Sequence, residues 1–414
     1  MMNDTELYRQ ILGIVSPWTI THVELNVDEE TVRVFAQYDS KLEPWCCPEC
    51  GKPAQGYDRR EERTWRHLDS CQFKTFLIAA APRVRCAQHG VQSLPVPWSA
   101  PHSRFTLLFE RFAIAVLQAT RVQAKAAHLL RLNPGQIHDL MGRAVSRGLS
   151  RRDNEEVLDH LCLDEKSFQK GHRFISILGD ADGKRVLDVV FSRTQKAVED
   201  LLEGTLSAVQ RKNVKSVSMD MWPAFMGARQ AVLPDAETVH DRFHIAQYLG
   251  EAVDKTRRTE SRDLGKRNDK TLHKSKYLWL RSEENLTEKQ SAALAALTSL
   301  ELETAKVWAF KESFRQFFHC QSEFGATHFF WQWHDAALAL DNIHLNKVAH
   351  MLRDHLAGLL AYIRHRVNNG IAEGMNSQIQ QIKSSARGFR RFDNFRVAIL
   401  FFMGKLDLYP QEIP

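Results

Sequence analysis

The sequence contains no apolar run that approaches the roughly 18 uninterrupted residues of a membrane-spanning helix. Its N-terminus, MMNDTELYRQ, carries acidic residues where a secretory signal would be basic. Both absences favour a protein that stays in the cytoplasm. The mean hydropathy of -0.37 and the 43% of hydrophobic residues describe a soluble chain with ample apolar side chains for its cores.

The cysteine content also argues against a disulfide framework. The seven cysteines are an odd number in a long chain without an export signal, which points to metal ligation or buried thiols. The charge excess is small: the net charge is +6 and the isoelectric point is about 8.9, which by itself only weakly indicates nucleic-acid binding. A chain of 414 residues should form several domains, since about 100–200 residues are typical of each.

Residues 1–100 begin with an alternation of apolar and polar residues, THVELNVDEETVRVFAQYD, which predicts a β-hairpin. Two metal-binding knuckles follow, each with two residues between its ligands and a glycine after them. These ligands are Cys47, Cys50, Cys86 and His89. Four such ligands are the number and type that structural zinc prefers. We therefore predict a zinc-binding β domain that gains folding energy from its metal.

The fourth ligand of this zinc site is open at the level of sequence. Cys46 or Cys71 could replace His89, and otherwise they read as a spare thiol and a small buried hydrophobe. The alternative to zinc is that the knuckles are incidental surface thiols with a histidine in a loop.

Residues 101–155 change to a helical period. Apolar residues recur at helical spacing from Phe105, a short second helix follows in VQAKAAHLLRL, and NPG at 133–135 interrupts before QIHDLMGRAVSRGL. This pattern predicts a helix-turn-helix whose third helix is the candidate to enter a major groove. The alternative is a three-helix bundle with a solvated basic face. The predicted DNA contacts here are Arg121, Lys125, Arg131, Arg143 and Arg147.

Residues 156–256 alternate strands and helices. LCLDEKSF, HRFISILGD and KRVLDVVFSR read as consecutive strands, the last two joined at a turn by Asp182-Gly183. The order then continues as helix, strand SVSMD, helix, strand TVHD and helix. That is the order of an RNase H-like core. The acids near the turn resemble the start of a calcium loop, but the remaining ligands are missing.

Residues 257–360 read as a basic, all-helical insertion, and residues 361–414 as C-terminal helices that return to the core. Basic residues interleaved with Tyr277 and Trp279 suit phosphate contact and base stacking. The alternative is solvated lysines around a tryptophan-rich core, which we favour for the aromatic run HFFWQWHD. The predicted DNA contacts in both segments are Lys274, Lys276, Arg281, Lys383 and Arg387.

Three acids have recognisable settings: Asp164 in LCLDEKS, Asp220 in KSVSMDMW and Glu373 in RVNNGIAEGMNS. If the first two strands are parallel neighbours, their carboxylates approach across one sheet while the helix of Glu373 packs against it. Hard oxygen ligands suit Mg²⁺ or Mn²⁺, and two ions about 3.5–4 Å apart support phosphodiester chemistry. The alternative is that each acid is an ordinary strand-end or helix-cap residue.

At this point the chain resembles the ISL-three group of bacterial insertion-sequence transposases, which have a DDE active site on an RNase H-like core. The resemblance rests on the paired knuckles, LDEKSF, MDMWPAF, DRFH, KYLWLRSEENLT and NNGIAEGMNSQIQQIKSSARGF. It implies that Asp164, Asp220 and Glu373 bind the catalytic metals. It also implies that Asp241 and His244 form a short motif near the site of strand transfer, although a core or helix-start histidine is the plainer interpretation of His244.

Two further residues are candidates near the site. Asn376, one helical turn beyond Glu373, is a candidate to orient that carboxylate, although helix-surface polarity explains it equally well. Trp222 could pack beside the substrate backbone or fill the core. One residue departs from the family pattern, since His89 stands where we would expect a cysteine.

The resemblance implies a DNA transposase of the bacterial nucleoid that binds the terminal inverted repeats of its element, with double-stranded DNA ends and target DNA as partners. Because two ends must be held together, at least a dimer is expected. One alternative is a non-catalytic DNA-binding repressor or domesticated relative, which would gain nothing from three buried carboxylates. Another is a resolvase-type nuclease, which would lack the long insertion and the paired DNA-reading modules.

Overall fold

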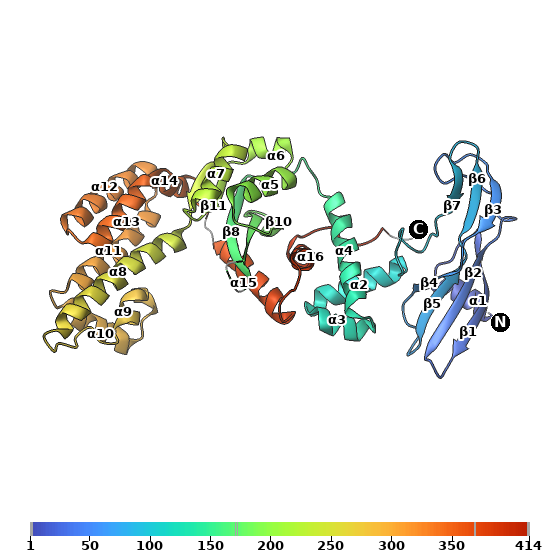
Figure 1. Cartoon of the computed structure of the whole chain (residues 1–414), viewed down its shortest axis with the longest axis horizontal. Helices are drawn as coiled ribbons and strands as arrows, with labels where there is room; N and C mark the ends of the chain where they lie inside the picture. Colours follow the sequence, from blue (N-terminus) through green and yellow to red (C-terminus); the bar gives the residue numbers. More distant parts are fainter. Residues whose placement is uncertain (1–2, 170, 172, 368–369, 412–414) are drawn as a thin grey trace. The chain divides into compact units, whose positions relative to one another are not determined.

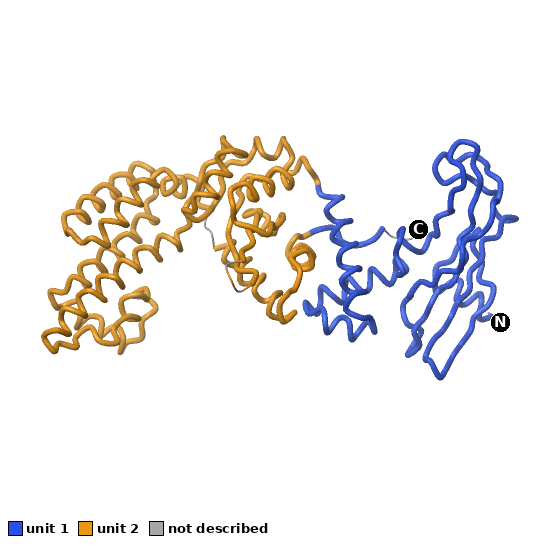
Figure 2. The backbone as a smooth tube through the Cα atoms, viewed as in Figure 1, with its two compact units in different colours: residues 1–152, 406–414 blue, residues 153–405 orange. Residues whose placement is uncertain are grey.

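The computed structural model describes residues 3–169, 171, 173–367 and 370–411. Most of its helices and strands are labelled in Figure 1. The chain forms two compact units, one of residues 1–152 with 406–414 and one of residues 153–405 (Figure 2). No helix in the described part of the chain is long and apolar enough to cross a membrane.

The first unit opens with a β module of two sheets. One sheet has the order β1-β2-β5-β4 and the other β3-β6-β7. The core of the module contains Trp18, Trp65 and Trp98, which are all at most 3% exposed. The elements are α1 (Asp4–Ile11), β1 (Trp18–Asn26), β2 (Thr31–Tyr38), β3 (Gln55–Arg59), β4 (Arg63–Arg66), β5 (Lys74–Ala79), β6 (Pro82–Cys86) and β7 (Gly90–Ser93).

Three helices follow the β module, as the sequence predicts. They are α2 (Leu107–Thr120), α3 (Gln123–Leu130) and α4 (Pro134–Ser150). The turn before α4 is fixed by a capping box, in which Asn133 and Gln136 each accept a hydrogen bond from the other's backbone N–H. Proline at the first position of α4 needs no backbone N–H there.

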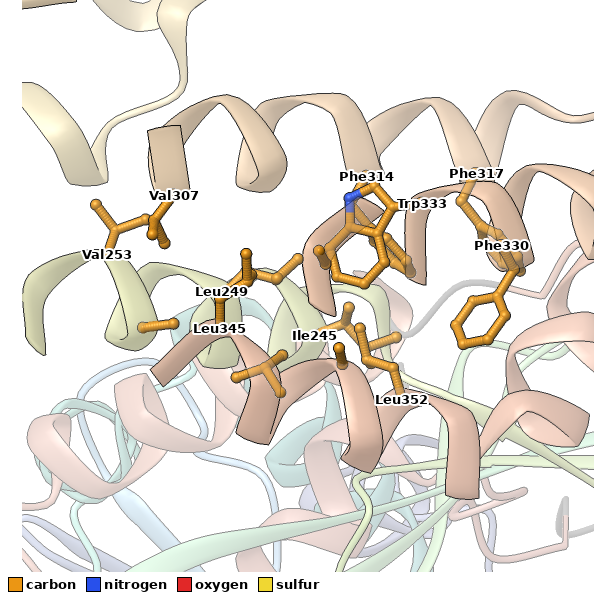
Figure 3. Close-up of a cluster of buried hydrophobic side chains, with 14 of the residues drawn as sticks. Ile245, Leu249, Val253, Val307, Phe314, Phe317, Phe330, Trp333, Leu345 and Leu352 are labelled. Atoms are coloured by element: carbon orange, nitrogen blue, oxygen red, sulfur yellow. The ribbon is translucent and has the colours of Figure 1, made fainter. Parts of the chain in front are cut away.

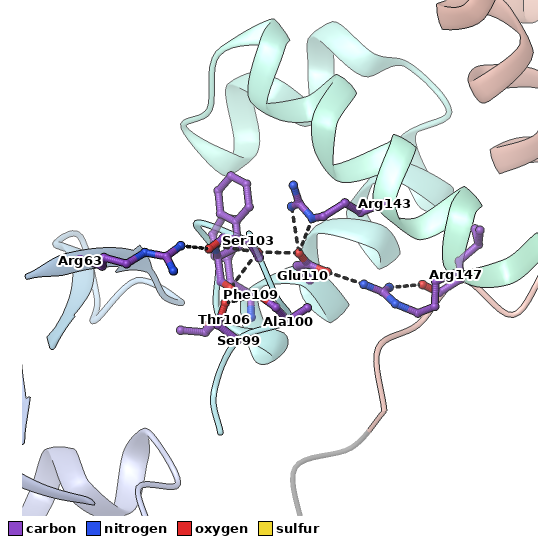
Figure 4. Close-up of polar contacts among 11 residues, drawn as sticks. Arg63, Ser99, Ala100, Ser103, Thr106, Phe109, Glu110, Arg143 and Arg147 are labelled. Atoms are coloured by element: carbon purple, nitrogen blue, oxygen red, sulfur yellow. Dashed lines mark hydrogen bonds and ion pairs between the residues drawn. The ribbon is translucent and has the colours of Figure 1, made fainter. Parts of the chain in front are cut away.

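A buried carboxylate joins α2 to α4 (Figure 4). Glu110 on α2 is 1% exposed, and it accepts hydrogen bonds from Arg143 at 2.8 Å and Arg147 at 2.7 Å on α4. Ser103 Oγ donates to the same carboxylate at 2.9 Å. These contacts give Arg143 and Arg147 an intramolecular role, distinct from the DNA contacts expected of them.

Replacing Glu110 by alanine is expected to loosen α2 and α4, because it leaves two guanidinium groups without the carboxylate that compensates them. Breaking a buried ion pair from one side costs about 3–5 kcal/mol. Hydrogen-exchange mass spectrometry of residues 107–150 should show local opening that is easier by that amount, with Glu62→Ala, an exposed glutamate of the same unit, as the control. Protection equal to that of the control would contradict the structural role.

The end of the chain returns to this first unit. Leu408 is 1% exposed, and its backbone oxygen accepts from Arg147 Nη1 at 2.6 Å. Arg151 pairs with Asp407 at 2.9 Å. At Gly148 an added Cβ would lie 2.6 Å from Leu406 Cβ, so only glycine leaves room for the returning segment there. The segment therefore completes the packing of α4.

The second unit contains a five-stranded mixed sheet with the order β10-β9-β8-β11-β12. Strands β8, β9 and β10 are antiparallel neighbours, whereas β8, β11 and β12 are parallel. The elements are β8 (His160–Gln169), β9 (Arg173–Asp180), β10 (Arg185–Val190), α5 (Gln195–Thr205), α6 (Ala208–Asn213), β11 (Ser216–Met219), α7 (Pro223–Val232), β12 (Glu237–His240), α15 (Gly370–Ser385) and α16 (Phe392–Met403). Asp182 and Gly183 lie in the turn between β9 and β10, as predicted.

A set of helices is inserted between β12 and α15. Its aromatic and aliphatic core includes Phe314, Phe330 and Trp333, together with Ile245 and Leu249 from the first of these helices (Figure 3). The aromatic run of the sequence thus supplies core residues, in agreement with the plainer prediction. The helices are α8 (Arg242–Gly265), α9 (Lys276–Leu280), α10 (Glu288–Thr298), α11 (Glu303–Phe314), α12 (Glu323–Ala339), α13 (Ile343–Asp354) and α14 (Leu356–His365), with short 3₁₀ turns η1 (Glu283–Asn285) and η2 (Arg315–His319).

The predicted boundary between residues 256 and 257 falls inside α8, which continues to Gly265. The run of lysine and arginine residues that suggested a new domain is compatible with helix, because both have high helix propensity. Helical pairs such as Lys255 with Glu251 at 3.2 Å also stabilise the segment. One long helix therefore carries the chain from the sheet into the helical region.

Candidate active site and metal cluster

The parallel strands place acidic residues next to one another, at the middle of β8 and just beyond the ends of β11 and β12. Ser218 on β11 is paired with Cys162 on β8, so continuing that register by two residues sets Asp220 beside Asp164. Met219 is paired with His240 on β12, so the next residues, Asp220 and Asp241, are neighbours too. Adjacent strands are about 4.8 Å apart. Three carboxylates therefore form a row across three strands.

Glu373 comes from α15, which packs along β8. Asn376, one turn after Glu373, donates from Nδ2 to Asp164 Oδ2 at 2.5 Å, and Lys383 Nζ donates to the Ser167 backbone oxygen at 2.9 Å. Seven helical residues and three strand residues each span about 10 Å, so these two contacts match in spacing. The helix therefore runs alongside the strand and brings its first turn to the acidic row.

Helix α8 contributes a histidine and a tyrosine to the same site. His244 Nδ1 lies 3.7 Å from Asp220 Oδ2, and His244 Nε2 lies 3.6 Å from Asp241 Oδ2. One turn further, burial raises the pKa of Tyr248, and the negative charge of nearby Asp220 raises it further. Asp241 also caps α8 by accepting the N–H of Phe243 at 2.9 Å. The cap fixes the start of the helix that carries both residues.

The site carries an excess of negative charge. Burial raises the pKa of Asp164 to about 6; Asp241 and Asp220 add to the rise, whereas the Glu165 N–H and His244 oppose it. Burial also raises the pKa of Glu373, and Asp241 is its second cause. Carboxylates that resist ionisation because of burial and like charge are the kind of donors that a bound cation stabilises.

The structure brings the predicted site residues together to different degrees. Asp164, Asp220, Asp241 and His244 are direct neighbours, whereas Glu373 interacts electrostatically with Asp241 and His244. Among the residues that the structure describes, these acids do not form a group that could share one metal ion. A site for two ions does not need such a compact group of ligands, because each carboxylate has to reach only one ion or to bridge the pair.

Two contacts near the site have no counterpart in the sequence predictions. The first is Tyr248, described above. The second is Arg193, whose guanidinium lies 4.8 Å from the ring of Trp222 and 4.3 Å from that of Phe174, and pairs with Glu165 at 3.1 Å. Trp222 is 39% exposed, so it does not simply fill the core. No local pattern marks either Tyr248 or Arg193, because both depend on chain segments that meet only on folding.

Gly179 on β9 has no side chain, which allows α15 to pack closely on the sheet. An added Cβ there would lie 2.6 Å from Cys162 Sγ and 3.0 Å from Met375 Sδ. Met375 is 5% exposed and lies between Glu373 and Asn376 in the sequence of α15. The absence of a side chain at Gly179 therefore sets how closely the helix of Glu373 approaches the strands.

Gly179→Ala is expected to destabilise the second unit by about 1–3 kcal/mol, the usual cost of an extra carbon in a packed core. Urea unfolding and hydrogen exchange in α15 measure this loss of stability. Cys162→Ala, which removes the nearest obstructing atom, should restore part of the loss. Gly204→Ala, where an added Cβ meets nothing within 4 Å, is the control. If Gly179→Ala and Gly204→Ala had the same stability, the close packing of α15 at Gly179 would be disproved.

A second cluster lies in the β module of the first unit. The ligand atoms of Cys47, Cys50, Cys86 and His89 all lie within 4.8 Å of one another. The Cys50–Cys86 sulfur distance is 3.8 Å, and His89 Nδ1 lies 3.6 Å from Cys47 Sγ. Ligands about 2.0–2.3 Å from a tetrahedral zinc ion are about 3.5–3.8 Å apart. The cluster therefore has the dimensions of a zinc site.

The backbone around the cluster suits thiolate ligands. The N–H groups of Gln88 and His89 lower the pKa of the Cys86 thiol to about 6. Gly51 and Gly90 follow the two knuckles at φ values of 68° and 65°, a conformation that favours glycine. The fourth member of the cluster is His89. The alternatives do not belong to it: Cys46 forms a β-bridge with Pro53, and Cys71 is exposed.

The basic residues predicted to contact DNA have varied surroundings. Arg131 pairs with Glu30 at 2.9 Å, and Arg281 donates to Gln290 at 3.2 Å. Lys276 lines a cavity of about 640 Å³ between α8 and α9. The exposed members of the set are Arg121, Lys125, Arg131, Lys274, Arg281 and Arg387.

Comparison with known proteins agrees with this geometry. Residues 161–399, more than half of the chain, match the family model of the ISL3-type DDE transposases, and residues 43–89 match the zinc-finger of the transposases of IS204, IS1001, IS1096 and IS1165. The chain therefore belongs to the ISL3 family of insertion-sequence transposases, an enzyme class that catalyses DNA cleavage and strand transfer.

Similar proteins include two transposases of nearly the same length. The transposase for insertion sequence element IS1001 of Bordetella parapertussis is 28% identical over 403 residues, which cover 95% of this chain and 98% of the relative. The transposase for insertion sequence element IS1557 of Mycobacterium tuberculosis is 26% identical over 418 residues, which cover 94% of this chain and 93% of the relative.

Proposed function

We propose that this transposase binds the terminal inverted repeats of its own insertion sequence and catalyses metal-dependent strand cleavage and strand transfer at Asp164, Asp220 and Glu373. The observation that carries the proposal is the row of carboxylates formed by Asp164 in the middle of β8 and by Asp220 and Asp241 directly after β11 and β12, met by α15. The strand order β10-β9-β8-β11-β12 supports an RNase H-like core, interrupted by the helical insertion between β12 and α15.

Mg²⁺ or Mn²⁺ fits the donor set, because both ions prefer carboxylate and carbonyl oxygens. In the proposal, Asp164, Asp220 and Glu373 hold two such ions. When bound, the pair activates the attacking water or DNA 3′-hydroxyl and stabilises the leaving oxygen. The raised pKa of Asp164 and a buried oxygen of Asn376 that has no hydrogen-bond partner within the described part of the chain support a site that a cation completes.

The surrounding side chains position the acids. His244 lies between Asp220 and Asp241, so its ring can hold both carboxylates in place. Tyr248 lies near Asp220 on the next turn of α8. The partly exposed ring of Trp222 offers a flat apolar surface beside Asp220 for a sugar or base of the DNA strand.

The first unit is proposed to read the element ends. The zinc module and the α2–α4 helices form one compact unit, and the turn between α3 and α4 fits a helix-turn-helix. In that motif the N-terminal residues of the second helix contact bases, which here means the start of α4. Exposed Arg121 and Lys125 are available for phosphates. A dimer or larger assembly is required to hold two ends.

The test uses the purified full chain, Mg²⁺ and a labelled duplex that carries the end sequence of the element. Wild-type protein is expected to bind and cut this duplex, and Asp220→Asn to bind it without cutting. Binding by both proteins with cutting by neither would instead identify a repressor. A duplex with a scrambled end separates sequence-specific from general binding.

A further inference from the structure

The two polar atoms of the Asn376 side-chain amide, Nδ2 and Oδ1, have different surroundings. Its Nδ2 donates to Asp164 Oδ2 at 2.5 Å. Its Oδ1 is buried and has no hydrogen-bond partner among the described residues. A buried acceptor left without a partner destabilises the folded state, so a further partner for this oxygen is expected.

The orientation of the amide follows from its neighbour. If the amide were turned over, Asn376 Oδ1 would face a carboxylate oxygen at the same short distance, and two acceptors would repel each other. The acidic row therefore fixes the amide with its N–H toward Asp164 and its carbonyl oxygen elsewhere.

The partners available to that oxygen are limited by the chemistry of the site. Asp164, Asp220, Asp241 and Glu373 are ionisable acids, and carboxylates accept hydrogen bonds but do not donate them when ionised. An amide oxygen beside a carboxylate such as Asp164 is instead a typical member of the oxygen shell of a divalent cation. Asn376 is also one helical turn from Glu373, so both side chains project from the same face of α15.

We propose that Asn376 Oδ1 is a ligand of a divalent cation that Asp164 also binds, while Asn376 Nδ2 holds Asp164 in its ligating orientation. This inference rests on the proposed function, since it requires the catalytic cation, and it adds a neutral fourth oxygen to the three acids. The close approach of Met375 to Gly179 sets the distance between this part of α15 and the sheet. One amide thus links the helix of Glu373 to the strand of Asp164 twice, once directly and once through the ion.

The test detects the contact itself, with Mn²⁺ as the probe. The full chain, with its zinc module intact, is prepared with ¹³C in the side-chain amide carbon of every asparagine, and electron–nuclear double resonance is recorded on bound Mn²⁺. A ¹³C coupling of the size given by a directly bound carbonyl is expected in the wild type. Asn376→Asp, which keeps an oxygen at that position but carries no label there, should bind Mn²⁺ and lose the coupling.

A binding series accompanies the spectra. Mn²⁺ titrations should show affinity about 10-fold or more lower in Asn376→Ala, and wild-type affinity in Ser377→Ala, an exposed neighbour on α15. If Mn²⁺ binds in an Asp164-dependent manner but no ¹³C coupling appears, the inference is wrong and the proposed function stands. If Asp164→Asn binds Mn²⁺ as the wild type does, the metal site of the proposed function fails as well.

Discussion

Replacing Asp164 by asparagine is expected to reduce strand cleavage on the order of 10³-fold or more, as for a residue that acts as part of a catalytic unit, and to leave binding to element ends unchanged. The reason is that asparagine keeps the shape of the side chain but removes the charge that a cation requires. Cleavage of the labelled duplex and its retardation in gels measure the two effects on the same preparation.

The fold should survive this substitution. Asp164 is a largely buried carboxylate whose pKa is raised to about 6 by burial, so its neutral isostere should be no less stable than the wild type. Asp182→Asn, in the exposed turn after β9, is the matched control and should cleave normally. Cleavage by Asp164→Asn at the rate of this control would remove Asp164 from the active site.

Cys86→Ser is expected to release zinc from the first unit and to unfold the small sheet β3-β6-β7. Apparent binding free energies of structural zinc are about 10–16 kcal/mol, more than a three-stranded sheet of this size can supply by packing. Two of the four ligands, Cys86 at the end of β6 and His89 just before β7, border this sheet directly. Elemental analysis should therefore give one zinc per chain in the wild type and none in the variant.

Hydrogen exchange in residues 43–93 reports the unfolding separately from the metal content. Cys71→Ser is the control, because Cys71 is exposed and outside the cluster. Retention of zinc by Cys86→Ser would overturn the ligand assignment. Loss of zinc with unchanged exchange would show instead that the sheet does not depend on its metal.

Local patterns were sufficient to predict the succession of elements around the acids of the sheet. Short apolar runs predicted β8 to β10, and the short runs ending in Asp220 and Asp241 predicted β11 and β12. Parallel pairing then makes acids at equivalent register positions neighbours, and continuing the register of the strands puts Asp164, Asp220 and Asp241 at such positions. These features follow from residues within one element and its turn.

Contacts between distant segments were not predictable from one sequence. From the sequence, Asn376 is a candidate to orient Glu373 or a polar residue of the helix surface, and no local pattern indicates its hydrogen bond to Asp164, a residue 212 positions away. Arg143 and Arg147 looked like free basic residues, yet their partner Glu110 lies 33 and 37 positions earlier. A charge pattern shows which residues carry charge, but whether an acid from another helix neutralises it depends on tertiary packing.

The segment from Leu406 to Pro410, which packs on α4, has a consequence for synthesis of the protein. A ribosome makes α2 and α4 before the second unit and this segment after it. The first unit therefore cannot reach its final packing until the second unit has been translated. A chain that stops before Leu406, through a frameshift or nonsense codon, would carry an incomplete first unit as well.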